Sequence, residues 1–304
     1  MLAIIIPYYK ISFFEEALES LANQTDKRFK VYIGDDASPE NPSKLIAKYK
    51  DQLDLVYHRF ETNLGGISLV QQWDRCVALS GDEEWLMILG DDDKLSPNCI
   101  EEFYKNKVEI KKYKNNVVRF ATVEIDGDSK IISKEYIHPK FEKATDSYYK
   151  KISYQTRSSL SEYVFSRKVY KKFGFYDYPL AWNSDDRAWL DFSDDKPILS
   201  INESIVYFRL SMYNISGKSD NKYLKNLSQI SFYRYLILNK FEFYTKQQKI
   251  NFLRRYENQI KNIRRLKYRE WVFLLFYFLK YFDFKEFKKF VKRFLNSILR
   301  RHEY

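Results

Sequence analysis

Short apolar segments alternate with amphipathic segments over the first ninety residues, and this alternation restricts the fold more than any other feature. The apolar segments have the length of buried strands and lie at residues 3–7, 29–36, 53–60 and 84–89. The amphipathic segments have helical periodicity and lie at residues 12–24, 42–50 and 68–80. Regular succession of strands and helices favours right-handed crossovers and parallel pairing. The sequence therefore predicts an α/β fold with a mostly parallel sheet flanked by helices.

Residues that could bind a ligand follow all four predicted strands. They are Pro7, Tyr8 and Tyr9 after the first strand, Asp35 and Asp36 after the second, the segment ETNLGG after the third, and Asp91, Asp92 and Asp93 after the fourth. In open α/β sheets, ligands bind beyond the carboxyl ends of the strands. We therefore expect one binding site along this edge.

The three consecutive aspartates, Asp91, Asp92 and Asp93, end the apolar segment WLMIL. That segment is apolar on both faces, which predicts a central strand and holds the carboxylates in a rigid, partly desolvated position. A shared Mg²⁺ or Mn²⁺ would offset their repulsion, because these cations take carboxylate and phosphate oxygens as ligands. The alternative is a solvated acidic loop or a cap for the helix that begins within LSPNCIEEF.

The aspartate pair Asp35 and Asp36 ends a neighbouring strand. A carboxylate oxygen at this place can accept a hydrogen bond from the N–H of a nucleobase edge. The alternative is an Asx turn that leads into the helix at Pro42. Each signal alone is moderate, but together with IIIPYY at the first strand the two aspartate groups form a pattern.

Five motifs in order make the chain resemble the family 2 glycosyltransferases, which have the GT-A fold. They are IIIPYY for the opening strand and P-x-Y turn, GDDAS for D-D-x-S, NLGG for the N-x-G loop, ILGDDDKLSP for the D-x-D region and NSDDRAW for the E-D motif. The resemblance covers about residues 1–215. We expect a catalytic domain at 1–221, with a nucleotide-binding half at about 1–97 and an acceptor-binding half at about 98–221.

The resemblance implies a nucleotide site. Pro7, Tyr9 and Asp36 would line the base and the ribose, and Asn63 and Gly65 of the N-x-G loop belong to the same nucleotide-binding set. UDP is the nucleotide that the resemblance favours.

The resemblance also implies a metal site and a catalytic base. Asp93 and Asp91 match the outer positions of D-x-D and would bind Mn²⁺ or Mg²⁺, and Asp92 would face the sugar or the ribose. Asp186 matches the catalytic base, and Asp185 occupies the place usually held by Glu. The alternative for Asp186 is a helix N-cap or a surface salt bridge.

The chemistry of sugar transfer requires this division of labour. The nucleotide diphosphate leaves with two negative charges, which a metal ion stabilises. A carboxylate on the other side of the anomeric carbon must accept the proton of the incoming hydroxyl, and a single in-line attack inverts the configuration.

The chain departs from the family pattern in three places. The ARN segment that often follows the N-x-G loop is missing, so that Arg75 is displaced and Gln71 or Gln72 stands nearer its place. Gly90 stands where many relatives carry an acid. The Q-x-x-R-W signature of processive synthases is absent, which favours transfer of a single sugar.

The sequence gives little support to other classes of protein. The chain has no G-x-x-x-x-G-K-[ST], G-x-G-x-x-G or G-x-S-x-G motif, and His58, His138 and His302 lack metal-ligand spacing. Cys76 and Cys99 are too few for a disulfide framework or a C-x-x-C zinc site, and we expect reduced core residues in a cytoplasmic protein. The contrasting hypothesis is a noncatalytic protein that binds a sugar nucleotide or a membrane surface.

The segment 222–304 carries the net positive charge of the chain, with 21 Lys and Arg against 6 Asp and Glu. Within it, residues 283–301 form a predicted basic amphipathic helix, and residues 269–301 could lie on the anionic inner face of the cell membrane. The alternative is packing on the catalytic domain or on a second copy in a homodimer. The chain has no nucleic-acid-binding motif.

We expect a glycan or lipid-linked acceptor of the cell surface, as in capsule, lipopolysaccharide or exopolysaccharide synthesis.

Overall fold

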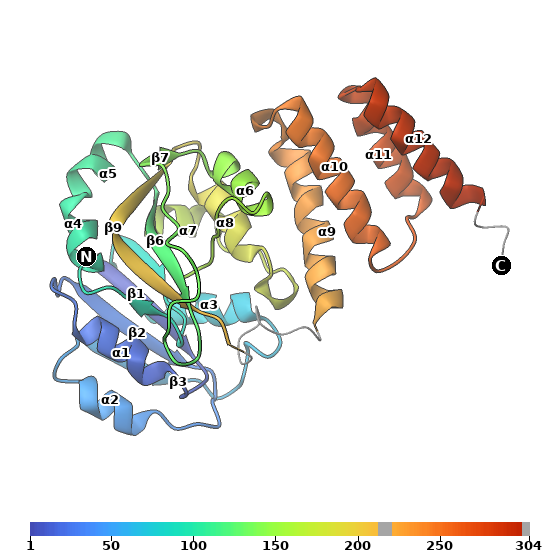
Figure 1. Ribbon diagram of the computed structural model, residues 1–304. Coiled ribbons are helices and arrows are strands. Elements are labelled where there is room, and N and C mark those ends of the chain that lie inside the picture. Colours follow the sequence, from blue (N-terminus) through green and yellow to red (C-terminus); the bar gives the residue numbers. More distant parts are fainter. Residues whose placement is uncertain (212–220, 300–304) are drawn as a thin grey trace. The chain divides into compact units, whose positions relative to one another are not determined.

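The computed structural model describes residues 1–211 and 221–299, so that His302 and the last residues of the predicted tail lie outside the described part. The chain divides into two compact units, Met1–Ser219 and Asp220–Tyr304, which are described separately (Figure 1). Within the described residues, none of the helices combines the length and the apolar character that crossing a membrane requires.

The first unit is built on one sheet, and its first four strands pair in parallel in the order β3-β2-β1-β4. These strands are β1 (Leu2–Tyr8), β2 (Phe29–Asp35), β3 (Leu55–Arg59) and β4 (Trp85–Ile88). The helices that connect them are α1 (Phe14–Ala22), α2 (Ser43–Tyr49) and α3 (Leu69–Val77). The predicted α/β fold with parallel crossovers is confirmed.

The sheet continues beyond β4 with mixed pairing. Its further strands are β5 (Lys94–Leu95), β6 (Val117–Ile125), β7 (Phe141–Glu142), β8 (Tyr163–Ser166) and β9 (Ile198–Arg209). Strand β8 lies between β4 and β6 and is antiparallel to both, whereas β6 and β9 pair in parallel. The chain turns between Asp126 and Lys130, and the segment after this turn joins β6 through isolated bridges at Ile131 and Tyr136.

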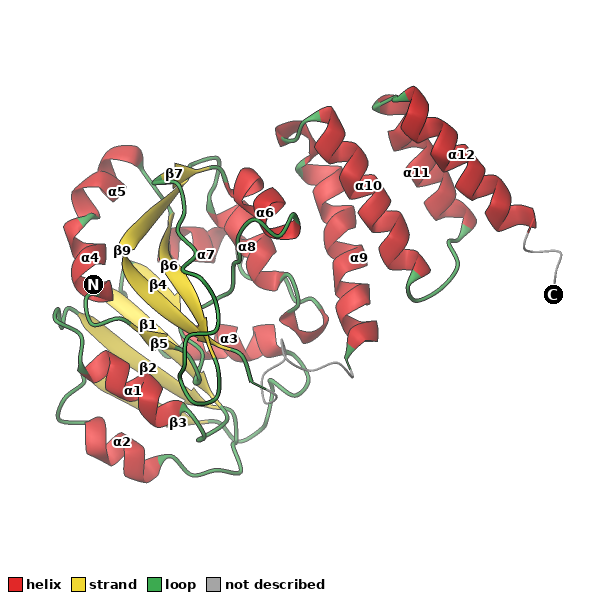
Figure 2. Ribbon diagram, in the orientation of Figure 1, coloured by secondary structure: helices red, strands yellow, loops and turns green. Residues whose placement is uncertain are grey.

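Six helical segments cover this second part of the sheet (Figure 2). They are α4 (Cys99–Lys105), α5 (Lys107–Tyr113), α6 (Ala144–Ile152), α7 (Arg167–Phe173), the short η1 (Pro179–Ala181) and α8 (Ser184–Phe192). Strand β8 is followed at once by α7. Helix α7 ends at Gly174, whose φ of 61° a residue with a side chain rarely adopts.

The core of the first unit lies around β1 and β4, whose side chains are buried on both faces of the sheet. Burial on both faces explains why these strands read as continuous apolar runs rather than as alternating patterns. Cys76 and Cys99 are buried and unbridged, as expected. The rigidity of β1 and β4 fixes the loops that follow them.

The second unit is helical, with α9 (Lys222–Asn239), the short η2 (Phe241–Phe243), α10 (Lys246–Lys261), α11 (Tyr268–Lys280) and α12 (Phe284–Leu299). Aromatic pairs join consecutive helices, such as Tyr233 with Phe252 and Tyr256 with Phe273. Phe290 of α12 stacks on Phe278 of α11, with ring centroids 4.7 Å apart. Part of the apolar face of the predicted basic helix is therefore covered by the preceding helix of the same unit.

Candidate active site

The loops after β1 and β4 are joined by the Asp91 carboxylate. Its Oδ2 atom accepts hydrogen bonds from the backbone N–H groups of Tyr9 at 2.8 Å and Lys10 at 2.9 Å. Burial raises the pKa of Asp91, and the two backbone donors act against that rise. The motifs after the first and fourth strands thus meet at one edge of the sheet.

Asp93 is the most enclosed of the three aspartates. The Ser161 hydroxyl donates to its Oδ2 atom, and the backbone N–H of Arg209 donates to Oδ1 at 2.8 Å. Burial raises the pKa of Asp93 to about 6, against these two hydrogen bonds. The end of β9 and the segment before β8 therefore both hold this carboxylate.

The Arg209 side chain, which is fully buried, holds the acidic loop from a second direction. Its guanidinium donates to the backbone oxygen of Asp92 at 2.9 Å and pairs with Glu16 at 3.0 Å. Because the loop backbone is held on both sides, the aspartates have fixed positions before any ligand binds.

Asp92 differs from its neighbours, because no hydrogen bond or ion pair engages its carboxylate within residues 1–211 and 221–299. Burial, followed by the charges of Asp93 and Asp91, raises the pKa of Asp92 well above its ordinary value. A Cβ atom on Gly90 would lie 2.9 Å from Asp92 Oδ1 and 3.0 Å from Asp93 Oδ2. The departure at Gly90 therefore has a steric reason, since the carboxylates occupy the space of a side chain.

The aspartates fit a divalent cation only together with further ligands. In the described part of the chain, no three His, Cys, Asp or Glu side chains are placed to hold a metal ion by themselves. Mg²⁺ and Mn²⁺ sites for nucleotides typically use one or two carboxylates and take the remaining oxygens from phosphates and water. Within the described residues Oδ1 of Asp91 accepts no hydrogen bond and each oxygen of Asp93 accepts one, so both carboxylates keep acceptor capacity for such a shared site.

Asp36 is bound within the protein rather than open to a ligand. It accepts hydrogen bonds from the backbone N–H groups of Leu64 at 2.8 Å and Gly65 at 2.9 Å, and it pairs with Arg75. A Cβ on Gly65 would meet Asp36 Oδ2 at 2.5 Å. Burial is the largest cause of the raised pKa of Asp36. The carboxylate thus fixes the NLGG loop, and Arg75 is a partner that the sequence motif did not identify.

The other predicted nucleotide residues lie at the same edge. Pro7 is opposite Gly34 in the β1–β2 ladder, and the Tyr9 ring is partly open to solvent while its backbone oxygen accepts from the Ser38 hydroxyl. Asn63 accepts a hydrogen bond from Gly66 N at 2.7 Å. Sequence reasoning therefore selected residues that the fold brings together.

Asp186, at the start of α8, is buried and has two partners. Lys151 of α6 donates to Oδ1 at 2.6 Å, and Asn183 donates to Oδ2 at 2.8 Å. Neither partner was identified from the sequence, since Lys151 lies outside the NSDDRAW motif and Asn183, its first residue, was not assigned a role. The alternative of a surface salt bridge does not describe this pair, because Asp186 is only 4% exposed.

The neighbouring Asp185 has no hydrogen bond from a side chain within the described residues. Burial, followed by the charge of Asp186, raises the pKa of Asp185 to about 7, whereas Lys151 acts in the opposite direction. The Glu162 charge raises the pKa of both Asp185 and Asp93. Geometry agrees, because Ser161 just before β8 binds Asp93, and Asp186 lines a small cavity with Ser158 and Tyr163.

The approach to α8 is conformationally strained. Leu180, Ala181 and Asn183 have φ angles of 59°, 52° and 69°, a region that residues with side chains rarely occupy. Each such residue costs about 1–3 kcal/mol and persists where surrounding contacts impose it, frequently at active sites. This strained turn brings the Asn183 amide within hydrogen-bond distance of the Asp186 carboxylate.

The two histidines in the described part of the chain, His58 and His138, make no hydrogen bond or ring contact with the acidic residues. His138 is buried, and burial lowers its pKa to about 3, which keeps the ring neutral. His58 stacks edge-on against Phe60.

Comparisons with known proteins bear on the family and the fold of the chain. The sequence matches the family described as Glycosyl transferase family 2 over residues 3–178. An uncharacterized glycosyltransferase of Mycoplasma genitalium is 34% identical over 108 residues, which are 34% of this chain and 36% of that protein. The match thus spans about a third of the length of the curated relative.

Two solved structures share the fold. Residues 1–349 of S. aureus TarS, in complex with UDP-GlcNAc, are 16% identical, with a TM-score of 0.65 over 94% of this chain and 82% of that chain. GalNAc-T7 with UDP, GalNAc and Mn²⁺ is 12% identical, with a TM-score of 0.54 over 86% of this chain and 56% of that chain. These similarities show a common GT-A-type architecture.

Proposed function

The chain belongs to glycosyl transferase family 2, and we propose that it is an inverting glycosyltransferase that moves a single sugar from a UDP-sugar to a hydroxyl group. The observation that supports this function most is that two acidic groups lie by the same segment before and at the start of β8, since Ser161 binds Asp93 and a small cavity is lined by Asp186, Ser158 and Tyr163. The TarS structures with UDP-GlcNAc and with UDP make a nucleotide-sugar donor the natural partner.

The proposed base is Asp186. Its carboxylate is held by Lys151 and Asn183, so that it can accept the proton of the acceptor hydroxyl without first changing its orientation. Lys151 would balance the negative charge of Asp186 while the acceptor binds. Asp185, with its pKa raised to about 7, is a second carboxylate at which that proton could reside.

The proposed ligands of Mn²⁺ or Mg²⁺ are Asp93 and Asp91, and Asp92 faces the sugar or the ribose. When bound, the cation would neutralise charge on the diphosphate leaving group. The residues of this chain fix the carboxylates through Tyr9, Lys10 and Arg209. GalNAc-T7, which shares the fold, was solved with Mn²⁺.

The proposed nucleotide site comprises Pro7, Tyr9, Asp36, Asn63 and Gly65. Tyr9 offers a partly open aromatic ring beside the β1 end, on which a base could stack. Asp36 would position the NLGG backbone. When the nucleotide binds, the Asp36 carboxylate would release Arg75 and accept a hydrogen bond from an N–H of the base.

The proposed acceptor is a glycan or lipid-linked molecule of capsule, lipopolysaccharide or exopolysaccharide synthesis, and we propose that the enzyme works in the cytoplasm on the inner face of the membrane. Exposed apolar side chains recur on one side of α11 at Tyr268, Val272, Leu275, Phe276 and Leu279, a helical repeat that suits an interfacial helix. A homodimer through the same helices is the competing use of this surface.

A direct assay separates this function from noncatalytic binding. We expect purified protein to hydrolyse or transfer from a UDP-sugar when Mn²⁺ is present and to lose most of that activity with a chelator. The Asp186→Asn variant should still bind UDP but transfer at least a hundredfold more slowly. Full transfer by this variant would remove Asp186 from the mechanism, and the absence of turnover with every UDP-sugar would favour a binding protein.

A further inference from the structure

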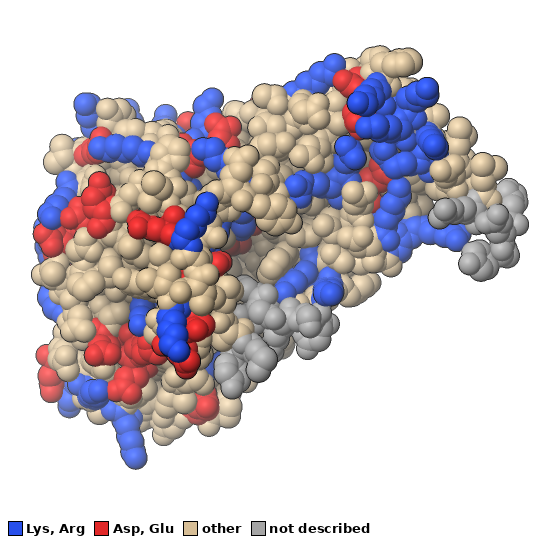
Figure 3. Space-filling model, viewed as in Figure 1, with Lys and Arg blue, Asp and Glu red and all other residues tan. Residues whose placement is uncertain are grey.

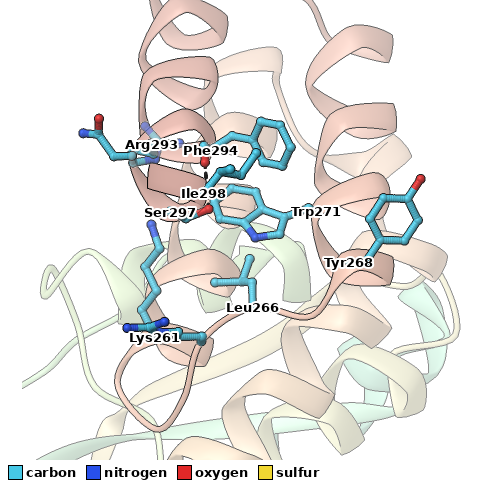
Figure 4. Close-up of a pocket in the computed structure, with 10 residues that line it drawn as sticks. Lys261, Leu266, Tyr268, Trp271, Arg293, Phe294, Ser297 and Ile298 are labelled. Carbon is cyan, nitrogen blue, oxygen red and sulfur yellow. Dashed lines mark hydrogen bonds between the residues drawn. The ribbon is translucent and has the colours of Figure 1, made fainter. Parts of the chain in front are cut away.

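The second unit contains a cavity of about 580 Å³ at the ends of α10, α11 and α12. Figure 4 shows the Trp271 indole in the middle of its lining, between Leu266 and the pair Phe294 and Ile298. The ring centroids of Trp271 and Phe294 are 5.2 Å apart in an edge-to-face arrangement. The cavity therefore has an aromatic, apolar floor and a volume typical of ligand sites.

Three cations, Lys261, Arg265 and Arg293, line the cavity beside this floor. Arg293 donates twice to the buried Glu257 carboxylate, at 2.8 Å each, and Lys261 pairs with the same carboxylate. Arg265 is exposed, and within the described residues no hydrogen bond or ion pair engages its guanidinium. The border is therefore positively charged, and Arg265 is available to an anion.

The surroundings of the cavity are apolar and basic as well. Tyr268 and Ile298 line the cavity and are exposed at its mouth, and Leu299 next to it is exposed. Figure 3 shows Lys and Arg side chains gathered over α12 on the visible face of this unit. A ligand that enters here meets hydrocarbon and positive charge together.

The apolar floor and the positively charged border together indicate which kind of ligand fits the cavity. Inorganic phosphate would leave the aromatic floor uncovered, and a neutral sugar would leave Arg265 without a charged partner. A second copy would bring two segments together that each carry 21 Lys and Arg against 6 Asp and Glu. An anionic lipid satisfies both the floor and the border.

We propose that this cavity binds the phosphate headgroup of an anionic lipid in the membrane surface, with Arg265 at the phosphate and Trp271, Phe294 and Ile298 against the start of the acyl chains. The proposal deepens the membrane contact proposed above and does not depend on sugar transfer. Binding here would hold the helical unit at the surface through one defined site in addition to its general positive charge.

The first test uses the full chain and monomeric short-chain lipids in a calorimetric titration. Dihexanoyl phosphatidic acid should bind with saturation at one site. Dihexanoyl phosphatidylcholine, which has the same chains without net charge, and inorganic phosphate, which has no chain, should each bind at least tenfold more weakly. Equal binding of inorganic phosphate would overturn the lipid assignment in favour of a free anion.

Two variants locate the site. Arg265→Gln should weaken binding of phosphatidic acid about fivefold through loss of one charge at the phosphate. Ile298→Ser should weaken it through the lost apolar contact. The matched control is Lys246→Gln, which removes an equally exposed charge roughly 22 Å away along α10 and should leave the affinity unchanged.

Vesicle sedimentation connects the site to a bilayer. The full chain should sediment with vesicles that contain phosphatidylglycerol and remain in solution with phosphatidylcholine alone, and Arg265→Gln should reduce the bound fraction more than Lys246→Gln. Equal effects of the two variants would overturn the proposal, as would a dimer that Arg265→Gln dissociates. UDP-sugar hydrolysis without lipid should be the same in all these variants, so that failure here is separate from failure of the transferase assignment.

Discussion

Replacement of Lys151 by methionine tests the buried carboxylate most directly, because it removes the charge and keeps most of the side chain. Lys151 Nζ lies 2.6 Å from Asp186 Oδ1, with side-chain exposures of 27% and 4%. Removing one partner of a buried ion pair typically costs 3–5 kcal/mol, since the other charge remains buried without compensation. The Asn183 hydrogen bond persists, and Lys151 is partly solvated. We therefore expect a loss of about 2–3 kcal/mol in the free energy of unfolding.

Urea denaturation at pH 8 measures this loss, and a double-mutant cycle identifies its cause. The cycle uses Lys151→Met, Asp186→Asn and their combination. If the loss comes from a stranded Asp186 charge, the combined variant should be more stable than the sum of the single effects predicts, by at least about 1 kcal/mol.

Lys172→Met is the matched control for this cycle. Lys172 Nζ lies 2.7 Å from Asp194 Oδ1, but both side chains are exposed, at 52% and 37%. This substitution should change the free energy of unfolding by less than about 0.5 kcal/mol. The reasoning fails if Lys151→Met costs no more than the control, or if the cycle is additive.

Three further predictions concern the same edge of the sheet. Burial and Asp186 raise the pKa of Asp185 to about 7 from an ordinary value of 3.8, so the folded state keeps a proton that the unfolded state releases between these values. The stability from this group is fully present below the unfolded-state pKa of 3.8 and is lost as the pH rises to the folded-state pKa of about 7. The free energy of unfolding of Asp185→Asn should therefore rise relative to that of wild type by roughly 2.5 kcal/mol between pH 5 and pH 8, as measured by denaturation. An equal difference at both pH values would contradict this. Gly90→Ala should displace the Asp92 and Asp93 carboxylates and lower UDP affinity in Mn²⁺, whereas Gly127→Ala, whose Cβ would have 4.0 Å of space, should change nothing in the same titration. UDP and Mn²⁺ together should raise the melting temperature by several degrees, since a ligand at a hundred times its Kd stabilises by about 2.7 kcal/mol, and Asp93→Asn should abolish the shift if the metal binds there.

The first half of the fold could be predicted because its signals are local. Residues 3–7 and 84–89 are apolar runs whose burial requires central strands, and the crossover rule then fixes their parallel order. The acidic residues follow those strands directly, so their common edge was predictable. The insertion of β8 between β4 and β6 was not predictable, because it depends on pairing between segments that are far apart in the sequence, such as Trp85 with Ser166 and Val117 with Phe165.

The partners of the acidic residues could not be predicted for the same reason. Arg75, Lys151 and Arg209 look like ordinary surface cations in the sequence, and only the tertiary fold brings them to Asp36, Asp186 and the loop of Asp93. Gly90 was recognised as a departure, but its steric role depends on side-chain positions. The E-D motif indicated Asp186 without the strained turn that sets its place.

The hydrogen bond from Arg209 to Asp93 defines the smallest part of the chain in which the acidic site can exist. Sequence similarity to the family ends at residue 178, before α8 and before the end of β9. A fragment that ends at residue 178 would retain Asp91, Asp92 and Asp93. It would lose Asp186 and the backbone N–H of Arg209, which donates a hydrogen bond to Asp93. Protease cleavage between α8 and Arg209 should likewise inactivate the enzyme while leaving every residue of the D-x-D segment intact. The shortest fragment that could keep the acidic site is thus set by a hydrogen bond between residues 116 positions apart in the chain.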